Sequence, residues 1–307
     1  MSAVAGRFTE TAMRQTLLRI ASQLGADASE ATLLRLTNNA VFALPSANLV
    51  VRITRSHRLH ARVHKVAALG VWFATVDAPT IRLAEQFSQP VQDGQLLATV
   101  WELVPATEPK PDASDLGAAL RTFHHLGLPP FELPAWDPIG DARTRIADAE
   151  ALDGADREFL LEWCDRLEPR LAAFIASAEV GLVHADAHEG NLLRQPDGRV
   201  VLCDFDATCR GPWQVDLVPA PANEARFGRT GGHQNLARAY GYDITTDPDW
   251  PLLREARELK MIAAGAPLLA SAPGVHAEFR LRLDSVRNND GQTRWTAFGD
   301  LPPLTAQ

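Results

Sequence analysis

The chain has 307 residues, of which 46% are hydrophobic and 22% are charged, and its formal net charge is -8. This length is sufficient for one large domain or for two lobes that each have their own core. The composition is ordinary for a globular protein. The acidic balance argues against a nucleic-acid binder, since such proteins usually carry a basic stripe on their surface.

The sequence predicts a cytoplasmic protein without a membrane span. Arg7, Glu10 and Arg14 interrupt any apolar run near the N-terminus, so no signal peptide is expected. No stretch approaches the roughly 20 apolar residues that cross a bilayer. The three cysteines show no C-x-x-C spacing, which predicts reduced thiols rather than a disulfide framework.

The first part of the chain carries helical and strand patterns in turn. Apolar residues at helical spacing predict a helix over residues 9–24, which Gly25 ends. Three short β-type runs follow, at residues 31–36, 41–44 and 49–53. Turns are predicted at Asn38-Asn39 and around Pro45, so these runs are expected to form an antiparallel meander.

A second helix is predicted over residues 61–74, followed by strands at residues 80–83 and 96–103. The composition then changes at residues 105–111, a segment with three prolines. Prolines at this density do not fit one helix or a central strand, so this segment is predicted to be a linker.

The rest of the chain is predicted to be mainly helical. Asp115 is expected to cap a helix that ends before Gly127. Further helices are predicted at residues 153–177, where Pro169 is expected to kink or break the helix, and at residues 252–269 and 275–286. The chain is therefore expected to combine a β-rich part, residues 1–104, with a larger helical part, residues 105–307.

The segment with the clearest chemical content is residues 182–206. Pro196-Asp197-Gly198 predicts a hairpin turn between strands at residues 191–194 and 200–203. In an antiparallel hairpin, the start of the first strand lies beside the end of the second, so Asn191 and Asp204 are expected at the same end. Asp186 lies five positions before Asn191, on the loop that leads into the hairpin.

Oxygen donors of this kind suit magnesium, which binds a few carboxylate or amide oxygens together with water and phosphate. A separate carboxylate nearby can act as a general base. Phosphoryl transfer requires mainly positioning and charge neutralisation from the protein. The segment is therefore consistent with a phosphoryl-transfer site.

The residues HADAHEGN and LCDFD resemble the H-G-D-x-H-x-x-N and I-D motifs of the aminoglycoside phosphotransferase and choline kinase families. The segments LVVRI, WELVP and DLGAALRTFHHL and the pair Asp216-Leu217 extend the resemblance over most of the chain. It implies an α+β, protein-kinase-like two-lobed fold. A small antiparallel-sheet lobe (residues 1–104) would bind the nucleotide, and a larger mainly helical lobe (residues 105–307) would carry the catalytic and acceptor-binding residues.

The resemblance also implies roles for single residues around the catalytic hairpin. Asp186 corresponds to the catalytic base, and Asn191 and Asp204 correspond to the magnesium ligands. His184 is expected to brace the loop by hydrogen bonds.

On the nucleotide side, the resemblance places Arg52 at the ATP phosphates, where a guanidinium can bind in a bidentate way. The backbone of residues 102–104, from Glu102 to Val104, corresponds to the segment that meets adenine. Asn38-Asn39, at the first turn of the meander, are expected either to cover the nucleotide, with Asn39 as the candidate residue, or to serve only as turn residues.

The sequence departs from the family pattern at four places. Ala185 replaces the usual glycine, Glu189 replaces a common proline, and Asp206 occupies the position of a kinase glycine. Asp206 is expected either to assist metal binding or to be a solvated carboxylate. The predicted helix at residues 61–74 contains no acid, so the partner that usually orients the phosphate-binding cation is not visible for Arg52.

The expected function is therefore magnesium-dependent transfer of the γ-phosphoryl group of ATP to a hydroxyl of a small molecule. The acceptor would be an antibiotic such as an aminoglycoside, or a hydroxylated metabolite. Its pocket is expected in the helical part, where Trp213, Glu224 and Asp243 are candidates by position alone. No nucleic-acid or membrane partner is expected.

Two alternatives stay open at this point. The missing acid on the second helix would fit a non-catalytic nucleotide-binding relative. Alternatively, His184, Asp186 and His188 alternate along the chain, so on a strand they would share one face and could bind a transition metal, as in a metallohydrolase.

Overall fold

The computed structural model describes residues 8–36, 39–55, 59–228, 230–270 and 274–301. The protein is of the expected α+β class, and the chain divides into two compact units. The sheet unit comprises Met1–Pro111, Pro129–Glu132 and Asn191–Ala207. The helical unit comprises Asp112–Leu128, Leu133–Gly190 and Thr208–Gln307.

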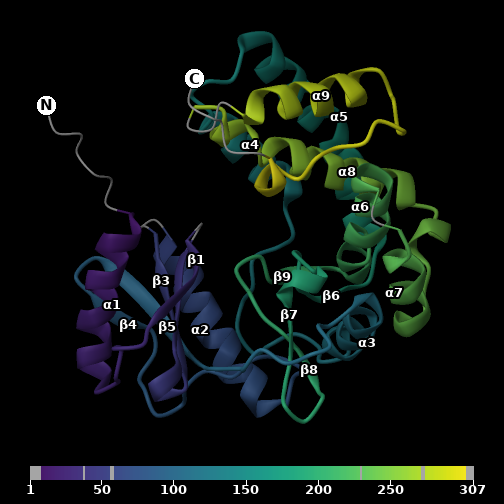
Figure 1. Cartoon of the computed structure of the whole chain (residues 1–307). Helices are drawn as coiled ribbons and strands as arrows, with labels where there is room; N and C mark the ends of the chain where they lie inside the picture. Colours follow the sequence, from purple (N-terminus) through teal and green to yellow (C-terminus); the bar gives the residue numbers. More distant parts are fainter. Residues whose placement is uncertain (1–7, 37–38, 56–58, 229, 271–273, 302–307) are drawn as a thin grey trace, which may run out of the picture. The chain divides into compact units, whose positions relative to one another are not determined.

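The sheet unit is built on a five-stranded sheet in which every pair of neighbouring strands is antiparallel (Figure 1). The strands, in the order in which they pair, are β1 (Thr32–Leu36), β2 (Asn39–Leu44), β3 (Leu49–Thr54), β5 (Leu96–Glu102) and β4 (Val91–Asp93). The predicted meander of three strands is therefore confirmed. Asn39 is the first residue of β2, and Asn38 lies outside the described residues.

The predicted strand at residues 80–83 is wrong. Thr80 forms an isolated bridge with Leu202, and Leu83 forms another with Trp101. Because the segment changes its partner within four residues, no continuous ladder forms. The strand β4 was not predicted, since three residues are too short to show an alternating pattern.

Two helices belong to this unit, α1 (Glu10–Leu24) and α2 (His60–Thr75). Gly25 ends α1 in the left-handed conformation that glycine adopts easily, as the sequence predicted. The apolar face of α1 packs on the side chains of alternate strand residues, among them Val51 and Ile53. Successive strand side chains point to opposite faces, so Arg52 lies on the other face of the sheet.

The predicted hairpin is confirmed. It consists of β7 (Leu192–Arg194) and β8 (Val200–Leu202), and the register pairs Leu192 with Leu202. One residue further out, the Cys203 N–H donates to the Asn191 carbonyl at 2.9 Å, which brings Asn191 and Asp204 to the same end of the hairpin.

The hairpin is integral to the sheet unit, although it lies far along the chain. The Ile81 N–H donates to the Leu202 carbonyl at 3.0 Å, and the Leu202 N–H donates to the Pro79 carbonyl at 2.8 Å. The buried ring of Phe205 lies 4.9 Å from that of Phe73, measured between centroids. The core of this unit therefore requires both distant segments of the sequence.

The helical unit contains α3 (Ala113–His124), α4 (Pro138–Ala147), α5 (Gly154–Ser177), α6 (Pro219–Phe227), α7 (Gly232–Tyr240), α8 (Trp250–Ala263) and α9 (Val275–Arg287). A two-stranded ladder joins β6 (Val180–Val183) to β9 (Cys209–Pro212). The helices α4, α6 and α7 and the strands β6 and β9 were not predicted.

Three details of the predicted helices need correction. Asp112, not Asp115, caps α3, and Asp115 completes the capping box as its third residue. Pro169 lies inside α5, and the helix continues through it. The helix predicted over residues 252–269 ends at Ala263 and is followed by a short 3-10 turn that contains Pro267, whose missing N–H cannot extend an α-helix.

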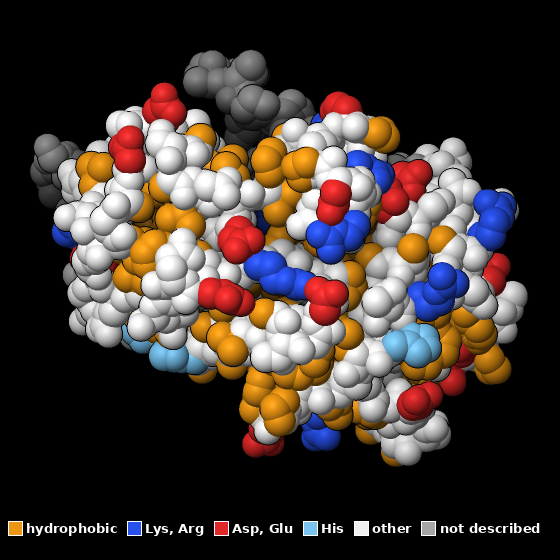
Figure 2. Space-filling view, turned by 90° about the horizontal axis from the view of Figure 1, so that it is seen from below, with side chains coloured by type: hydrophobic (Ala, Val, Ile, Leu, Met, Phe, Trp, Pro, Cys, Tyr) orange, Lys and Arg blue, Asp and Glu red, His pale blue; other side chains and the backbone are white. Residues whose placement is uncertain are grey.

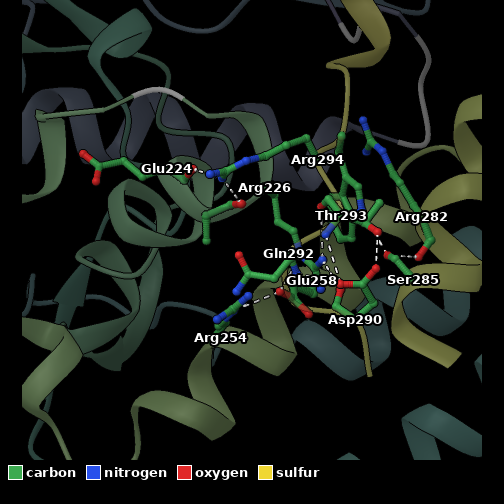
Figure 3. Close-up of polar contacts among 12 residues, drawn as sticks. Glu224, Arg226, Arg254, Glu258, Arg282, Ser285, Asp290, Gln292, Thr293 and Arg294 are labelled. Carbon is green, nitrogen blue, oxygen red and sulfur yellow. Dashed lines mark hydrogen bonds and ion pairs between the residues drawn. The ribbon is translucent and has the colours of Figure 1, made fainter. Parts of the chain in front are cut away.

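Polar contacts tie the C-terminal segment of the helical unit to its helices (Figure 3). The Glu258 carboxylate of α8 accepts hydrogen bonds from Arg226 Nε at 2.8 Å and from Arg254 Nε at 3.0 Å. Arg226 also donates to the Asp290 carbonyl at 2.8 Å. The Arg226 and Glu258 side chains are only 3% and 10% exposed, so this ion pair is shielded from water.

On the face shown in Figure 2, lysine and arginine side chains lie among acidic ones rather than in a continuous basic stripe. Within the described residues, the helices are all too short or too polar to cross a membrane.

We predict that Glu258→Ala lowers the free energy of unfolding by about 3–5 kcal/mol, because it leaves a buried guanidinium without its carboxylate. The control is Glu168→Ala, which breaks an ion pair with Arg143 at an exposed site and is expected to change stability by about 1 kcal/mol or less. Urea denaturation of both variants provides the measurement. Equal effects of the two substitutions would contradict this account of the network.

Candidate active site

A buried carboxylate holds the loop that follows β6. Asp216, which is 1% exposed, accepts hydrogen bonds from the backbone N–H groups of His184 and Ala185, both at 2.7 Å. Its Oδ2 also lies 3.0 Å from His124 Nε2 of α3. The loop backbone next to Asp186 is thus fixed by one side chain from the 3-10 turn at Trp213–Asp216.

Asp186 lies on this loop, in the helical unit. Its Oδ1 is 3.6 Å from the Lys260 ammonium, and Lys260 donates a hydrogen bond of 2.9 Å to the Ala185 carbonyl. Burial by itself raises the pKa of Asp186. The surrounding positive charges outweigh this effect and hold the pKa below its usual value; in decreasing order they belong to Lys260, Arg257, His188 and His184. At neutral pH the Asp186 side chain is therefore a carboxylate that can accept a proton.

The substitution of alanine for the family glycine has a visible consequence in this loop. Ala185 has a φ of 61°, in the left-handed region that glycine adopts without strain and other residues rarely adopt. Such a conformation costs on the order of 1–2 kcal/mol for a residue with a Cβ. The hydrogen bond from the Ala185 N–H to Asp216 helps to hold it.

The second group of predicted site residues lies in the sheet unit, around Arg52. Its Nη2 is 2.5 Å from Asp206 Oδ2 and 3.3 Å from Asp204 Oδ1. Arg35 of β1 lies 3.3 Å from the other oxygen of Asp204. Asn39 Nδ2 donates to Asp206 Oδ2 at 3.1 Å. The strands and the hairpin thus bring Arg52, Asn39 and Asp204 together around Asp206. The role of Asn39 in covering the nucleotide stays a prediction.

Asp206 is the acid that orients Arg52. The helix α2 supplies none, but Lys65 of α2 donates to the Asp206 backbone carbonyl at 2.8 Å. Burial raises the pKa of Asp206, and the charge and hydrogen bond of Arg52, followed by smaller contributions from Arg62 and Asn39, outweigh it and lower the pKa. Asp206 is therefore the ionised partner of Arg52 and not a solvated carboxylate.

Asn191 and Asp204 have the chemistry of magnesium ligands. Both offer oxygen atoms, from an amide and a carboxylate, and both lie at the same end of the hairpin. Asn191 is buried, whereas the Asp204 side chain is 29% exposed and open to a solute. This donor set fits a magnesium ion that takes its remaining ligands from water and phosphate.

The residues predicted to meet adenine lie at the end of β5. Glu102 is the last residue of this strand, pairs with Leu49 and has an exposed side chain. The next N–H, that of Leu103, donates to the Asn48 carbonyl at 3.0 Å, and Val104 follows outside the sheet. Adenine binding by these residues stays a prediction.

The metallohydrolase alternative required His184, Asp186 and His188 to share one face of a strand. β6 ends at Val183, so these residues lie in a loop and the alternation has no such geometry. Across the described ranges, no group of three or more His, Cys, Asp or Glu side chains is arranged to hold a metal ion.

The three positions suggested for the acceptor pocket are engaged in local contacts. Trp213 stacks on Tyr240 with 5.7 Å between ring centroids. Glu224 accepts a hydrogen bond of 2.6 Å from the His233 N–H, and Asp243 lies 2.8 Å from His233 Nε2. Their part in acceptor binding stays a prediction.

The sequence pattern missed three residues near Asp186. Asp216 was noticed only as part of a resemblance, and Arg257 and Lys260 of α8 carry no motif. Lys260 contacts Ala185 across 75 positions of the chain, so only the tertiary fold reveals the contact.

We predict that Asp216→Ala lowers the free energy of unfolding by about 3–5 kcal/mol, since it leaves the buried His184 N–H and the part-buried Ala185 N–H without their acceptor. The amides of His184 and Ala185 should also exchange with solvent faster, which hydrogen exchange measures. Asp197→Ala is the control, because Asp197 accepts comparable bonds from Arg199 in an exposed turn. Slow exchange of the two amides in Asp216→Ala would count against this role.

The sequence matches the model of the phosphotransferase enzyme family over residues 20–259. No curated protein matches it. Among solved structures, a microcompartment-associated aminopropanol kinase is similar with a TM-score of 0.67 and 19% identity, covering 90% of this chain and 99% of the other. A choline/ethanolamine kinase family protein from Mesorhizobium loti has a TM-score of 0.61 and 15% identity, covering 91% and 93%.

A spectinomycin phosphotransferase solved with ADP and spectinomycin has a TM-score of 0.58 and 16% identity, covering 89% of this chain and 92% of the other. At these identities the likeness concerns the fold, and it confirms the expected protein-kinase-like two-lobed architecture. The family model covers most of the chain, which confirms the resemblance seen in the motifs: this protein belongs to the phosphotransferase enzyme family.

Proposed function

We propose that this protein transfers the γ-phosphoryl group of magnesium-ATP to a hydroxyl group of a small molecule, with Asp186 as the general base. The observation that carries the proposal is the cluster in the sheet unit, where Arg52 contacts both Asp204 and Asp206. A phosphoryl-transfer site needs a cation for the phosphates directly beside a carboxylate for the metal. Family membership supports the same type of reaction.

A small acceptor is supported by the names of the similar structures. They include an aminopropanol kinase, a choline/ethanolamine kinase family protein and a spectinomycin phosphotransferase. The spectinomycin phosphotransferase structure holds ADP, and two further similar structures hold GDP and AMP, which supports nucleotide use here. An antibiotic and a hydroxylated metabolite are both consistent with this range of acceptors.

In the sheet unit, Arg52 would bind the ATP phosphates, and the backbone of Glu102 and Val104 would bind adenine. Asn39 would keep Asp206 in place beside Arg52. Asn191 and Asp204 would hold magnesium, which when bound neutralises charge on the phosphates.

The contact lengths favour this division of roles. Arg52 is 2.5 Å from Asp206 but 3.3 Å from Asp204, so the first contact is the stronger one. Asp206 can therefore keep Arg52 in place while Asp204 gives up its longer contacts. This arrangement leaves one carboxylate for the guanidinium and one for the metal.

Asp186 would accept the proton of the acceptor hydroxyl. As that oxygen forms its bond to the γ-phosphorus, the bond between the γ-phosphorus and the bridging oxygen breaks and ADP leaves. Lys260 and Arg257 keep Asp186 ionised and therefore ready to accept the proton.

We predict that Asp186→Asn lowers kcat about 100-fold or more, because an amide cannot accept the proton. ADP release from magnesium-ATP, measured against a panel of hydroxylated antibiotics and metabolites, provides the test. Asp197→Asn, in an exposed turn, is the control and should retain full turnover. Turnover of Asp186→Asn close to that of the unaltered protein would refute the assignment.

We predict that Asp206→Asn raises the KM for ATP about tenfold with a smaller change in kcat. Arg52 loses its charged partner, and tenfold corresponds to about 1.4 kcal/mol, close to the lower end of the range for a hydrogen bond to a charged group. If Asp206 were a metal ligand instead, its loss would raise the magnesium requirement, so titration with magnesium at saturating ATP separates the two roles.

The non-catalytic alternative is addressed by the same measurements. The missing acid on the second helix motivated it, and Asp206 removes that motive because it pairs with Arg52. Nucleotide binding without ADP release on any acceptor would favour this alternative over the proposed transferase.

A further inference from the structure

The helix α8 directs two cations toward the loop that carries Asp186. Arg257 and Lys260 are three positions apart, and residues at this spacing share one face of a helix. Lys260 is engaged, since its ammonium donates to the Ala185 carbonyl at 2.9 Å and lies 3.6 Å from Asp186 Oδ1. Lys260 therefore already has partners beside the proposed base.

Arg257 differs from the other shielded arginines of the helical unit. Arg226 is paired with Glu258, and Arg282 is paired with Glu278. Arg257 makes no hydrogen bond or ion pair with any residue of the described chain, and its Nε is shielded from solvent without an acceptor. Burial lowers the pKa of Arg257, and the charge of Asp186 offsets only part of this effect.

A small pocket lies against these cations. Its walls include Trp136, Pro138, Ala185, Val215, Arg257 and Lys260, and its volume is about 30 Å³. The residues around it supply two positive charges, apolar surface and no carboxylate. Because one water needs roughly 10–15 Å³ of such space, the pocket accommodates a group of a few atoms.

We infer that the small molecule that accepts the phosphoryl group carries a carboxylate, which Arg257 and Lys260 hold in this pocket beside Asp186. A guanidinium binds a carboxylate through two parallel hydrogen bonds, and an anion would offset the positive charge that α8 places here. An amino alcohol would bring a further positive charge to the same two cations. The inference rests on the proposed phosphotransferase function and narrows its acceptor to hydroxy acids.

The test compares hydroxy acids of three to five carbons with their primary amides and with amino alcohols of the same length. ADP release from magnesium-ATP gives kcat/KM for each compound. We expect the acid to exceed its amide about tenfold to 100-fold, roughly the effect of one hydrogen bond to a charged group. Arg257→Gln should remove this preference, and Arg257→Lys should restore part of it.

Arg166→Gln is the matched control, because it removes the same charge from an exposed position of α5 and should leave the preference intact. Arg257→Gln should fold normally, with a melting temperature that is unchanged or higher, since Arg257 makes no hydrogen bond or close ion pair that would be lost. A preference for the amide or the amino alcohol, or an acid preference that persists in Arg257→Gln, would overturn the inference.

Calorimetric binding of the same compounds separates this inference from the proposed function. Binding of a hydroxy acid over its amide, lost in Arg257→Gln, supports the carboxylate site even if no ADP is released, and the missing release then counts against the transferase alone. If the protein instead phosphorylates uncharged or cationic acceptors without preference for an acid, the transferase function is supported and the inferred carboxylate site is wrong.

Discussion

The position of the proposed base depends on one buried carboxylate. Asp216 accepts hydrogen bonds from two consecutive backbone N–H groups of the loop and contacts a histidine of α3, and it therefore fixes the loop. Hydrogen bonds to a charged acceptor contribute about 1.5–3 kcal/mol each, which is sufficient to offset the left-handed conformation of Ala185. The backbone next to Asp186 is thereby held by two hydrogen bonds, and the cations of α8 favour the ionised form of Asp186.

In the sheet unit, a carboxylate likewise holds a functional candidate in place, here the guanidinium of Arg52. In the proposed function Arg52 binds phosphate and needs an acid to orient it, and α2 contains no acid. Asp206, two residues after Asp204, takes this part, and Asn39 and Lys65 bind it from β2 and α2. The carboxylate that pairs with Arg52 therefore comes from the segment after the hairpin and not from α2.

The sequence allowed the α+β class, the meander and the hairpin register to be predicted, because alternation and an Asp-Gly turn are local signals. The same register placed Asn191 beside Asp204. The sequence could not reveal contacts between residues that lie far apart in the chain. Asp216 accepts a hydrogen bond from the His184 N–H across 32 positions, and Lys260 donates to the Ala185 carbonyl across 75. The bridges of Thr80 and Leu83 also depend on partners elsewhere in the chain, which explains why a strand was wrongly predicted there.

The path of the chain has a consequence for dissecting the protein. The sheet unit takes in residues 191–207 from the middle of the helical unit, so the backbone passes repeatedly from one unit to the other. No single cut yields two complete units. A fragment that stops at Pro111 would lack Phe205, the aromatic partner of Phe73 and Trp101, and would expose apolar surface that is buried in the intact chain. A separately expressed fragment of the sheet unit therefore needs the hairpin grafted onto it, or supplied as a peptide, to complete its core.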